Sequence, residues 1–283
     1  MSNRISKPVA LAIALLTVAS LMLSACGAAA PKDLLSTIKA RGVMRVSSDP
    51  NYKPQSFLNE TTKELDGFDI DVSKEVAKRL GVKVEFVTPD WDTIVAANWG
   101  GRWDVSIGSM TITPERKKVL FFSTPYYYTP AQFAALKDSP LNSVDDLVGK
   151  TVCVGSGTTY DDYLNGKLTL EGEKIIKQVQ GVKMTTFSTD AECIQSLQAG
   201  RKDFEAVLTA QPTVEDAIKS GVQLKKLGGP VYYEDLAAAM DQKVPNSDSF
   251  VQAVSKAIDD MHKDGTLTNL SMKWYGVDLT KKQ

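Results

Sequence analysis

Short apolar runs alternate with amphipathic segments along the first half of the chain. The apolar runs predict strands over 43–46, 82–87 and 104–108. Between them, apolar residues at helical spacing predict helices over 70–80 and 90–99, with Asp69 and Asp90 as their N-caps. This β-α-β-α-β order predicts a parallel sheet with helical crossovers and with ligand crevices at the carboxyl ends of its strands.

The same alternation restarts near residue 150. Strands are predicted over 152–154, 184–187 and 206–208. Helices are predicted from Thr158 to Leu164 and after Thr189, which has capping-box spacing to Glu192. We therefore expect an α/β protein with two similar lobes.

A late amphipathic segment over 250–261 decides how the lobes are connected. Its apolar stripe needs a sheet to cover, and we expect the first lobe to receive it. The chain then crosses between the lobes twice, near 129–133 and near 228–233, and two crossover strands form a hinge. The predicted division is 37–130 with 230–283 for lobe 1, and 131–229 for lobe 2.

The N-terminal segment has the features of a secretory signal. Arg4 and Lys7 precede an apolar run over 9–23, which is too short to span a bilayer. The tetrapeptide ending at Cys26 resembles the lipobox of bacterial lipoproteins, which implies a signal peptide over 1–25 and a lipid anchor, with acyl chains such as palmitate, on Cys26. The alternative is an ordinary cleaved signal with an incidental cysteine. Residues 26–36 are small and polar enough to form a tether.

Composition narrows the chemistry. The net charge of -1 gives no reason to expect a nucleic-acid partner. With one histidine, His262, and two cysteines besides Cys26, the chain lacks the residues for most zinc sites and for Ser-His-Asp catalysis, so we expect no metal and no cofactor. Outside the cytoplasm Cys153 and Cys193 are candidates for a disulfide, and two buried free thiols are the alternative.

Arg116 is the first candidate for anion binding. It follows a buried strand that ends in small and hydroxylated residues, and Thr113-Pro114 predicts a helix start. A guanidinium beside free N–H groups of a helix start is a good carboxylate receptor. The alternative is an ion pair on a solvated face.

A second candidate lies between a strand and a helix of lobe 2. Gly155, Gly157 and the helix start at Thr158 and Thr159 allow a close backbone approach to an anion. The segment lacks the ending of a phosphate loop, so a nucleotide site is not indicated. Tyr52 after a strand and Trp91 at a helix start are placed to stack on a ligand in the same crevice, and partly buried core positions are the alternative.

The order of these motifs resembles that of the extracytoplasmic solute-binding proteins of polar amino acid ABC transporters, solute-binding protein family 3. The segments that carry the resemblance are 49–54, 67–71, 90–92, 108–116, 122–126, 157–159 and 273–276. It implies a two-lobed periplasmic-binding-protein-like fold of type II that closes on a ligand. It implies a monomer that is tethered by lipid at a bacterial membrane, in the periplasm or at the cell surface, and that delivers its ligand to a permease.

The resemblance also implies residue roles. Arg116 and the Thr159 backbone would bind the ligand carboxylate, and Ser109 and Thr111 its carboxylate and amino groups. Tyr52 and Trp91 would stack on the ligand side chain, with Asp49 near its end. The candidate ligand-binding set is Asp49, Tyr52, Trp91, Ser109, Met110, Thr111, Arg116, Thr158, Thr159 and Glu234.

One position departs from the family pattern. Ala210 stands where the family has the aspartate that holds the ligand α-ammonium. An ammonium taken out of water without a counter-charge is costly, so another acid must take the role, with Asp161, Asp49 or Glu234 as candidates, or the ligand lacks an ordinary α-ammonium.

We expect capture and delivery without a covalent step, and therefore no enzyme. The fold also resembles that of a cyclohexadienyl dehydratase, so an enzyme on the same scaffold is the competing hypothesis, with Glu173 or Glu234 as its acid. A sensor domain that passes a ligand signal to a receptor is a third.

Overall fold

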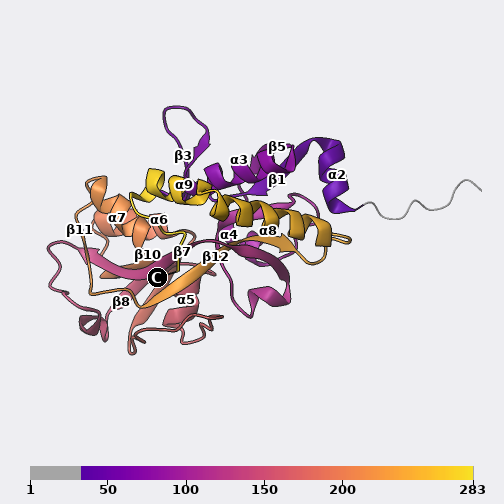
Figure 1. The fold of residues 1–283 in the computed structure, drawn as a ribbon. Coiled ribbons are helices and arrows are strands. Elements are labelled where there is room, and N and C mark those ends of the chain that lie inside the picture. Colours follow the sequence, from indigo (N-terminus) through magenta and orange to yellow (C-terminus); the bar gives the residue numbers. More distant parts are fainter. Residues whose placement is uncertain (1–32, 283) are drawn as a thin grey trace, which may run out of the picture.

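The structure is a computed structural model that describes residues 33–282. It is a mixed α/β fold in which one sheet runs through two lobes (Figure 1). The strands are β1 (Val43–Ser47), β2 (Asn51–Tyr52), β3 (Ser56–Leu58), β4 (Leu65–Asp66), β5 (Lys83–Val87), β6 (Val105–Thr111), β7 (Leu120–Leu136), β8 (Thr151–Gly155), β9 (Lys183–Phe187), β10 (Ala206–Ala210), β11 (Leu224–Lys226) and β12 (Tyr232–Asp241). The α-helices are α2 (Leu34–Arg41), α3 (Phe68–Leu80), α4 (Trp91–Val95), α5 (Thr159–Leu164), α6 (Asp190–Gln198), α7 (Gln211–Lys219), α8 (Asp248–Lys263) and α9 (Thr266–Tyr275).

The sheet order explains how two lobes share one sheet. The order is β5-β1-β6-β12-β7-β10-β8-β9, with β11 paired to β7. Strands β5, β1 and β6 form a parallel set, and β10, β8 and β9 form another. The antiparallel pair β12 and β7 joins the two sets, because each of these strands pairs with β6 or β10 on its other side. The predicted crossovers near 129–133 and 228–233 therefore pair with each other, with Glu234 opposite Thr129.

Each lobe has its own apolar core. In lobe 1, α3, α8 and α9 pack together over the sheet (Figure 1). The stripe predicted on α8 is part of this core, with Phe250, Val254 and Ile258 fully buried. The C-terminal helices α8 and α9 thus pack in the same core as α3. A separate core surrounds Phe133, Tyr163 and other residues of lobe 2.

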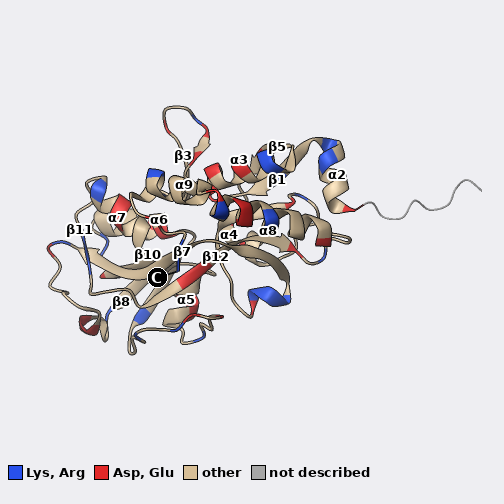
Figure 2. Ribbon diagram, viewed as in Figure 1, with Lys and Arg blue, Asp and Glu red and all other residues tan. Residues whose placement is uncertain are grey.

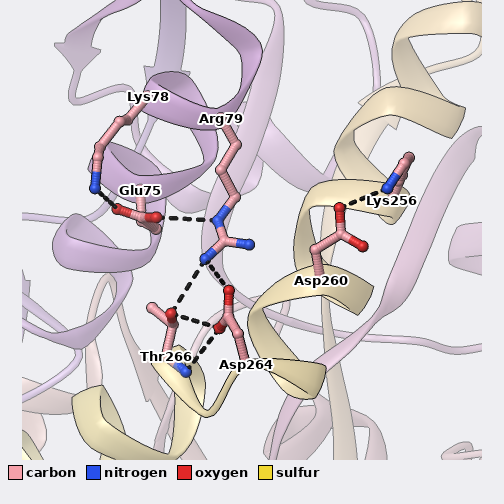
Figure 3. Close-up of polar contacts among 7 residues, drawn as sticks. All are labelled: Glu75, Lys78, Arg79, Lys256, Asp260, Asp264 and Thr266. Carbon is pink, nitrogen blue, oxygen red and sulfur yellow. Dashed lines mark hydrogen bonds and ion pairs between the residues drawn. The ribbon is translucent and has the colours of Figure 1, made fainter.

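Polar contacts fasten the helices of lobe 1 to one another. Arg79, near the end of α3, donates to Glu75 at 3.0 Å and to Asp264 in the turn between α8 and α9 at 2.7 Å (Figure 3). The Thr266 and Arg79 hydrogen bonds hold the pKa of the Asp264 carboxyl down at about 2. Acidic and basic residues both lie along α3 and α8, whereas acidic residues mark β12 where it crosses between the lobes (Figure 2).

Two predicted helices have wrong boundaries. Helix α3 begins at Phe68 with Gly67 as its N-cap, so Asp69 lies inside the first turn. A side chain at Gly67 would come within 2.4 Å of the Gln55 carbonyl oxygen, at a φ of +125°, so only glycine fits there. Helix α4 ends at Val95 instead of Trp99, because the chain turns away and the Trp99 N–H donates to Asp241 at 3.1 Å.

Two further expectations need correction. Thr113-Pro114 does not start an α-helix, because Arg116–Lys118 form one short 3-10 turn that leads directly into β7. Helix α2 begins at Leu34 with Asp33 as its cap, so the last three residues of the predicted tether are helical. The predicted signal peptide and Cys26 lie outside the described residues.

A disulfide joins Cys153 on β8 to Cys193 on α6, across a sequence separation of 40 residues. Helix α6 has the predicted capping box, in which the Thr189 hydroxyl and the Glu192 carboxylate each accept from the other residue's backbone N–H. The disulfide and the cap together fix the start of α6 against the carboxyl end of β8.

Candidate functional site

A cavity of about 50 Å³ lies between the lobes. Its walls come from the carboxyl ends of strands in both lobes and from β12 where it crosses. The lining residues are Asp49, Tyr52, Trp91, Gly108, Ser109, Thr111, Arg116, Gly155, Thr158, Thr159, Tyr160, Ser188, Thr189, Asp190 and Glu234.

Nine of the ten predicted ligand-binding residues line this cavity. The exception is Met110, whose side chain is fully buried in a core cluster of lobe 1 with Trp99 and Trp103. Successive residues of a strand point to opposite faces, so Met110 faces the core of lobe 1 whereas Thr111 faces the cleft. Asp161 is also outside the lining, and its carboxylate accepts from the Gly157 N–H at 3.2 Å and from Asn165 at 2.6 Å.

The Arg116 guanidinium is held between the lobes. It donates to the Thr111 carbonyl of lobe 1 at 3.0 Å and to the Gly157 carbonyl of lobe 2 at 3.2 Å. The residue is 9% exposed, and no salt bridge reaches it within residues 33–282. Burial lowers the pKa of Arg116, but an arginine remains protonated in proteins. The site therefore contains a buried cation that no carboxylate pairs directly.

Trp91 and Tyr52 are the two lobe 1 aromatic residues that line the cavity. The Trp91 ring centroid is 5.5 Å from the Arg116 guanidinium carbon, and its indole N–H donates to the Gly157 carbonyl at 3.2 Å. The Tyr52 hydroxyl lies 3.4 Å from that of Tyr160. These contacts join the lobes, so the same side chains that line the cavity also hold it closed.

Glu234 occupies the crossover strand at the back of the cavity and is 2% exposed. One carboxylate oxygen accepts from Thr111 of lobe 1 at 2.6 Å and from Thr159 of lobe 2. The other accepts from Tyr160 at 2.9 Å and from Thr129 at 3.5 Å. Hydroxyl groups from both lobes therefore converge on this one carboxylate.

Ser109 lines the cavity, but its hydroxyl points into lobe 1. It donates to Asp69 at 2.7 Å, and the Ser109 N–H donates to the Tyr126 hydroxyl at 2.9 Å. The φ of Ser109 is +56°, a left-handed conformation that is uncommon outside glycine. Burial raises the pKa of the Asp69 carboxyl to about 7, against the two hydrogen bonds that lower it.

Asp190 is the acidic residue that the sequence analysis missed. It lies in the first turn of α6, is 6% exposed and lines the cavity. Its carboxylate accepts from the Gly155 N–H at 2.8 Å and from the Thr209 hydroxyl at 2.7 Å. Burial is the main cause that raises the pKa of Asp190 to about 7, and the nearby Glu234 and Asp49 add to it. The sequence offered one signal for Asp190: Thr209, beside Ala210, is a polar residue at the end of a predicted strand, and a buried hydroxyl there needs a polar partner.

His262 and Glu173 both lie outside this cavity. His262 is on α8, where its Nε2 lies 2.8 Å from the Pro125 carbonyl oxygen, and it does not line the cavity. Glu173, one of the two candidate acids, instead forms an ion pair with Lys282 at 2.7 Å. Within 33–282, no cluster of three or more His, Cys, Asp or Glu side chains is arranged to hold a metal ion.

None of the helices between residues 33 and 282 combines the length and the apolar character that a bilayer-spanning helix needs.

A family profile and the sequence of a known amino acid-binding protein both match most of this chain. The sequence profile described as "Bacterial extracellular solute-binding proteins, family 3" matches residues 44–277. The L-cystine-binding protein TcyJ of Escherichia coli (strain K12) is 34% identical over 254 residues, which are 89% of this chain and 90% of that protein.

Solved structures agree with the fold. A variant of the arginine-binding protein ArgBP from T. maritima superimposes with a TM-score of 0.73 at 29% identity, covering 86% of this chain and 99% of that one. The ancestral amino acid-binding protein AncCDT-1, described as a precursor of cyclohexadienyl dehydratase, has a TM-score of 0.73 at 33% identity, with 85% and 99% covered. The two-lobed fold expected from the sequence is confirmed.

Proposed function

Because the chain belongs to family 3 of the bacterial extracellular solute-binding proteins, we propose that it is the solute-binding component of an ABC importer and that it captures a polar amino acid or a related small carboxylate. It binds this ligand between the lobes and delivers it unchanged to a permease. The names of its relatives, which include cystine- and arginine-binding proteins, support an amino acid as the ligand.

The observation that carries the proposal is the environment of Arg116. A guanidinium that is 9% exposed, borders a cavity and has no salt bridge among the described residues is poised for an external carboxylate. Its two protein hydrogen bonds leave other N–H donors of the guanidinium free for that ligand. A carboxylate from the ligand would supply the missing charge in a low-dielectric site, where such a bond is strong.

Closure of the lobes fits this role. The contacts of Arg116 and Trp91 with the Gly157 carbonyl form only when lobe 2 approaches lobe 1. The two crossover strands β7 and β12 form the hinge about which the lobes separate. We propose that the ligand binds first to lobe 1 through Arg116 and Thr111, and that closure adds the donors at Thr158 and Thr159.

We further propose that the protein acts as a lipid-anchored monomer outside the cytoplasm. The basic start, apolar run and Cys26 motif support a lipoprotein, in which Cys26 carries the acyl chains. Cells that are fed a labelled fatty acid are expected to incorporate the label into the wild-type protein, and the change Cys26→Ala is expected to abolish this incorporation.

The test is a calorimetric titration against the common L-amino acids, L-cystine and small carboxylates. We expect micromolar or tighter binding of at least one amino acid, and we expect Arg116→Ala to lose about 2 to 5 kcal/mol of its binding free energy. Arg201→Ala is the control, because Arg201 is an exposed arginine of lobe 2 paired with Asp203. Unchanged affinity in Arg116→Ala would remove this residue from the site.

The enzyme hypothesis has a direct test in the same experiment. AncCDT-1 supports it only through its described relation to a dehydratase. The ligand recovered after long incubation with excess protein is expected to have its original mass. A product that is lighter than the ligand by the mass of one water and one carbon dioxide would establish catalysis instead.

A further inference from the structure

The cavity has a second buried ionisable side chain that, like Arg116, forms no ion pair within residues 33–282. Asp190 is 6% exposed and lines the cavity, and no salt bridge reaches it within the described part of the chain. Arg116 and Asp190 therefore border one cavity as buried groups of opposite sign, each without an ion-pair partner. An amino acid zwitterion carries the complementary pair, a carboxylate and an ammonium.

Counting hydrogen bonds separates Asp190 from Glu234. An ionised carboxylate has about four acceptor positions. At Glu234 the hydroxyls of Thr111 and Thr159 fill one oxygen, and Tyr160 at 2.9 Å with a long contact from Thr129 at 3.5 Å leaves at most one acceptor position on the other. At Asp190 each oxygen accepts one hydrogen bond, from Gly155 and from Thr209, so each retains an acceptor position. An ammonium has three donors to place, and Asp190 can accept from it.

The other candidate acids fit this role less well. Asp161 does not line the cavity. Asp49 lines it but is only half-buried, so its charge is more accessible to water than that of Asp190. An aspartate in the first turn of a helix is usually solvated too, yet Asp190 is almost completely buried. Leaving its charge without a cation is therefore the most costly of the three.

We propose that Asp190 binds the α-ammonium group of the amino acid ligand, while Arg116 binds its carboxylate. The assignment rests on the proposed function and adds a residue to it. Asp49 is then left for the ligand side chain. The raised pKa of Asp190 agrees with this role, because a cation bound beside the carboxylate would restore its charged form.

The local structure holds Asp190 in place for this contact. Its carboxylate bonds to the last residue of β8, and Cys153 on that strand is joined to Cys193 one turn further along α6. A side chain at Gly155 would approach an Asp190 carboxylate oxygen to 2.8 Å, so glycine at 155 allows the helix start to come this close. Because these contacts fix the Asp190 side chain before binding, it loses little conformational entropy when the ligand binds.

The experiment is a double-mutant cycle in which one change removes the Asp190 carboxylate and the other removes the amino group of the ligand. Wild type and Asp190→Asn are titrated with L-cystine and L-arginine, and with their deaminated analogues 3,3′-dithiodipropionate and 5-guanidinopentanoate. For the amino acids that bind wild type, Asp190→Asn is expected to weaken binding at least about 30-fold. For the deaminated analogues, the two proteins are expected to differ by less than about threefold.

Asp162→Asn is the matched control. Asp162 is on α5 in the same lobe, is exposed and interacts electrostatically with Arg116, but it does not line the cavity. We expect it to change affinity for the amino acids by less than about threefold. Circular dichroism and the melting temperature of each variant establish that it is folded before titration.

Two outcomes would overturn the assignment. Asp190→Asn could bind the amino acids as wild type does, or it could weaken the amino acids and the deaminated analogues equally, which would show a structural role alone. Failure of the proposed function gives a different result, since wild type would then bind no amino acid of the wider panel.

Discussion

Each lobe buries one aspartate with a pKa raised to about 7, and the two differ in what they face. Asp69 of lobe 1 is sealed behind Ser109 and Tyr126, whose hydroxyls donate to it. Asp190 of lobe 2 also accepts two hydrogen bonds, yet it borders the cavity. A raised pKa is therefore not enough to identify a binding residue here. Contact with the cavity and an open acceptor position distinguish Asp190 from Asp69.

The largest expected effect is the dependence of stability on pH, which both aspartates share. Between pH 4 and pH 7 the folded protein binds more protons at Asp69 and Asp190 than the unfolded chain does, because both pKa values are raised. The free energy of unfolding should fall as pH rises through this window, by up to about 4 kcal/mol per group. Urea unfolding of the ligand-free protein at several pH values measures the slope.

Asp69→Asn and Asp190→Asn should each flatten this slope. If only one of them does so, the two carboxyls are not equivalent in the ligand-free protein. If neither does, other groups set the pH dependence, and the raised pKa values are contradicted. Asp264, whose pKa is lowered to about 2, acts with the opposite sign and only below about pH 4.

The next effect concerns the disulfide, which lies only in lobe 2. Replacing both cysteines, Cys153→Ala and Cys193→Ala, is expected to lower the free energy of unfolding by roughly 3 to 4 kcal/mol, because the bond closes a loop of 40 residues in the unfolded chain. Urea unfolding of the double variant measures it. Because the bond also fixes the start of α6, affinity for the amino acid should fall with stability. Loss of stability with unchanged affinity would mean that Asp190 does not depend on the disulfide for its position.

The smallest effect separates the two aspartates most sharply. A ligand ammonium beside Asp190 lowers its pKa, so binding near pH 6.5 should release up to one proton, and affinity should rise by less than tenfold per pH unit between pH 5 and pH 7. The groups that interact with Asp190 are Thr209, the Gly155 N–H, the carboxylates of Glu234 and Asp49, and the hydroxyls of Tyr52, Tyr160 and Tyr232.

Calorimetry in two buffers of different ionisation enthalpy measures this proton release. Asp190→Asn should abolish it, and Asp69→Asn should leave it unchanged. If Asp190→Asn still releases a proton on binding, another group is the source of that proton. Asp190 and Asp69 would then not differ in their response to the ligand.

The fold could be predicted from patterns that extend over many residues. The alternation of strands and helices in two blocks predicted the two lobes. The apolar stripe of α8, with Phe250 and Ile258, predicted that this helix covers the sheet of lobe 1. Boundaries were less predictable. The cap at Gly67 depends on how closely the Gln55 backbone approaches, and this contact is set by tertiary structure.

The site was partly predictable for the same reason. Thr111 ends a buried strand and Arg116 follows it, so their place at the cleft follows from topology. Met110 was misplaced because a motif does not reveal which strand residues face inward. Asp190 was missed because an acid in a first helical turn resembles an ordinary solvated residue. Its burial depends on Gly155 and Thr209, which lie far from it in the sequence.

The central claim is that the cavity binds an amino acid by its two charged groups, with one group on each lobe. A crystal structure of the complex with the tightest-binding amino acid tests it most directly. The account predicts carboxylate oxygens of the ligand within about 3 Å of the Arg116 guanidinium and its ammonium nitrogen within about 3 Å of an Asp190 oxygen. An ammonium placed on Glu234 or Asp49, with Asp190 left without a ligand contact, would contradict it.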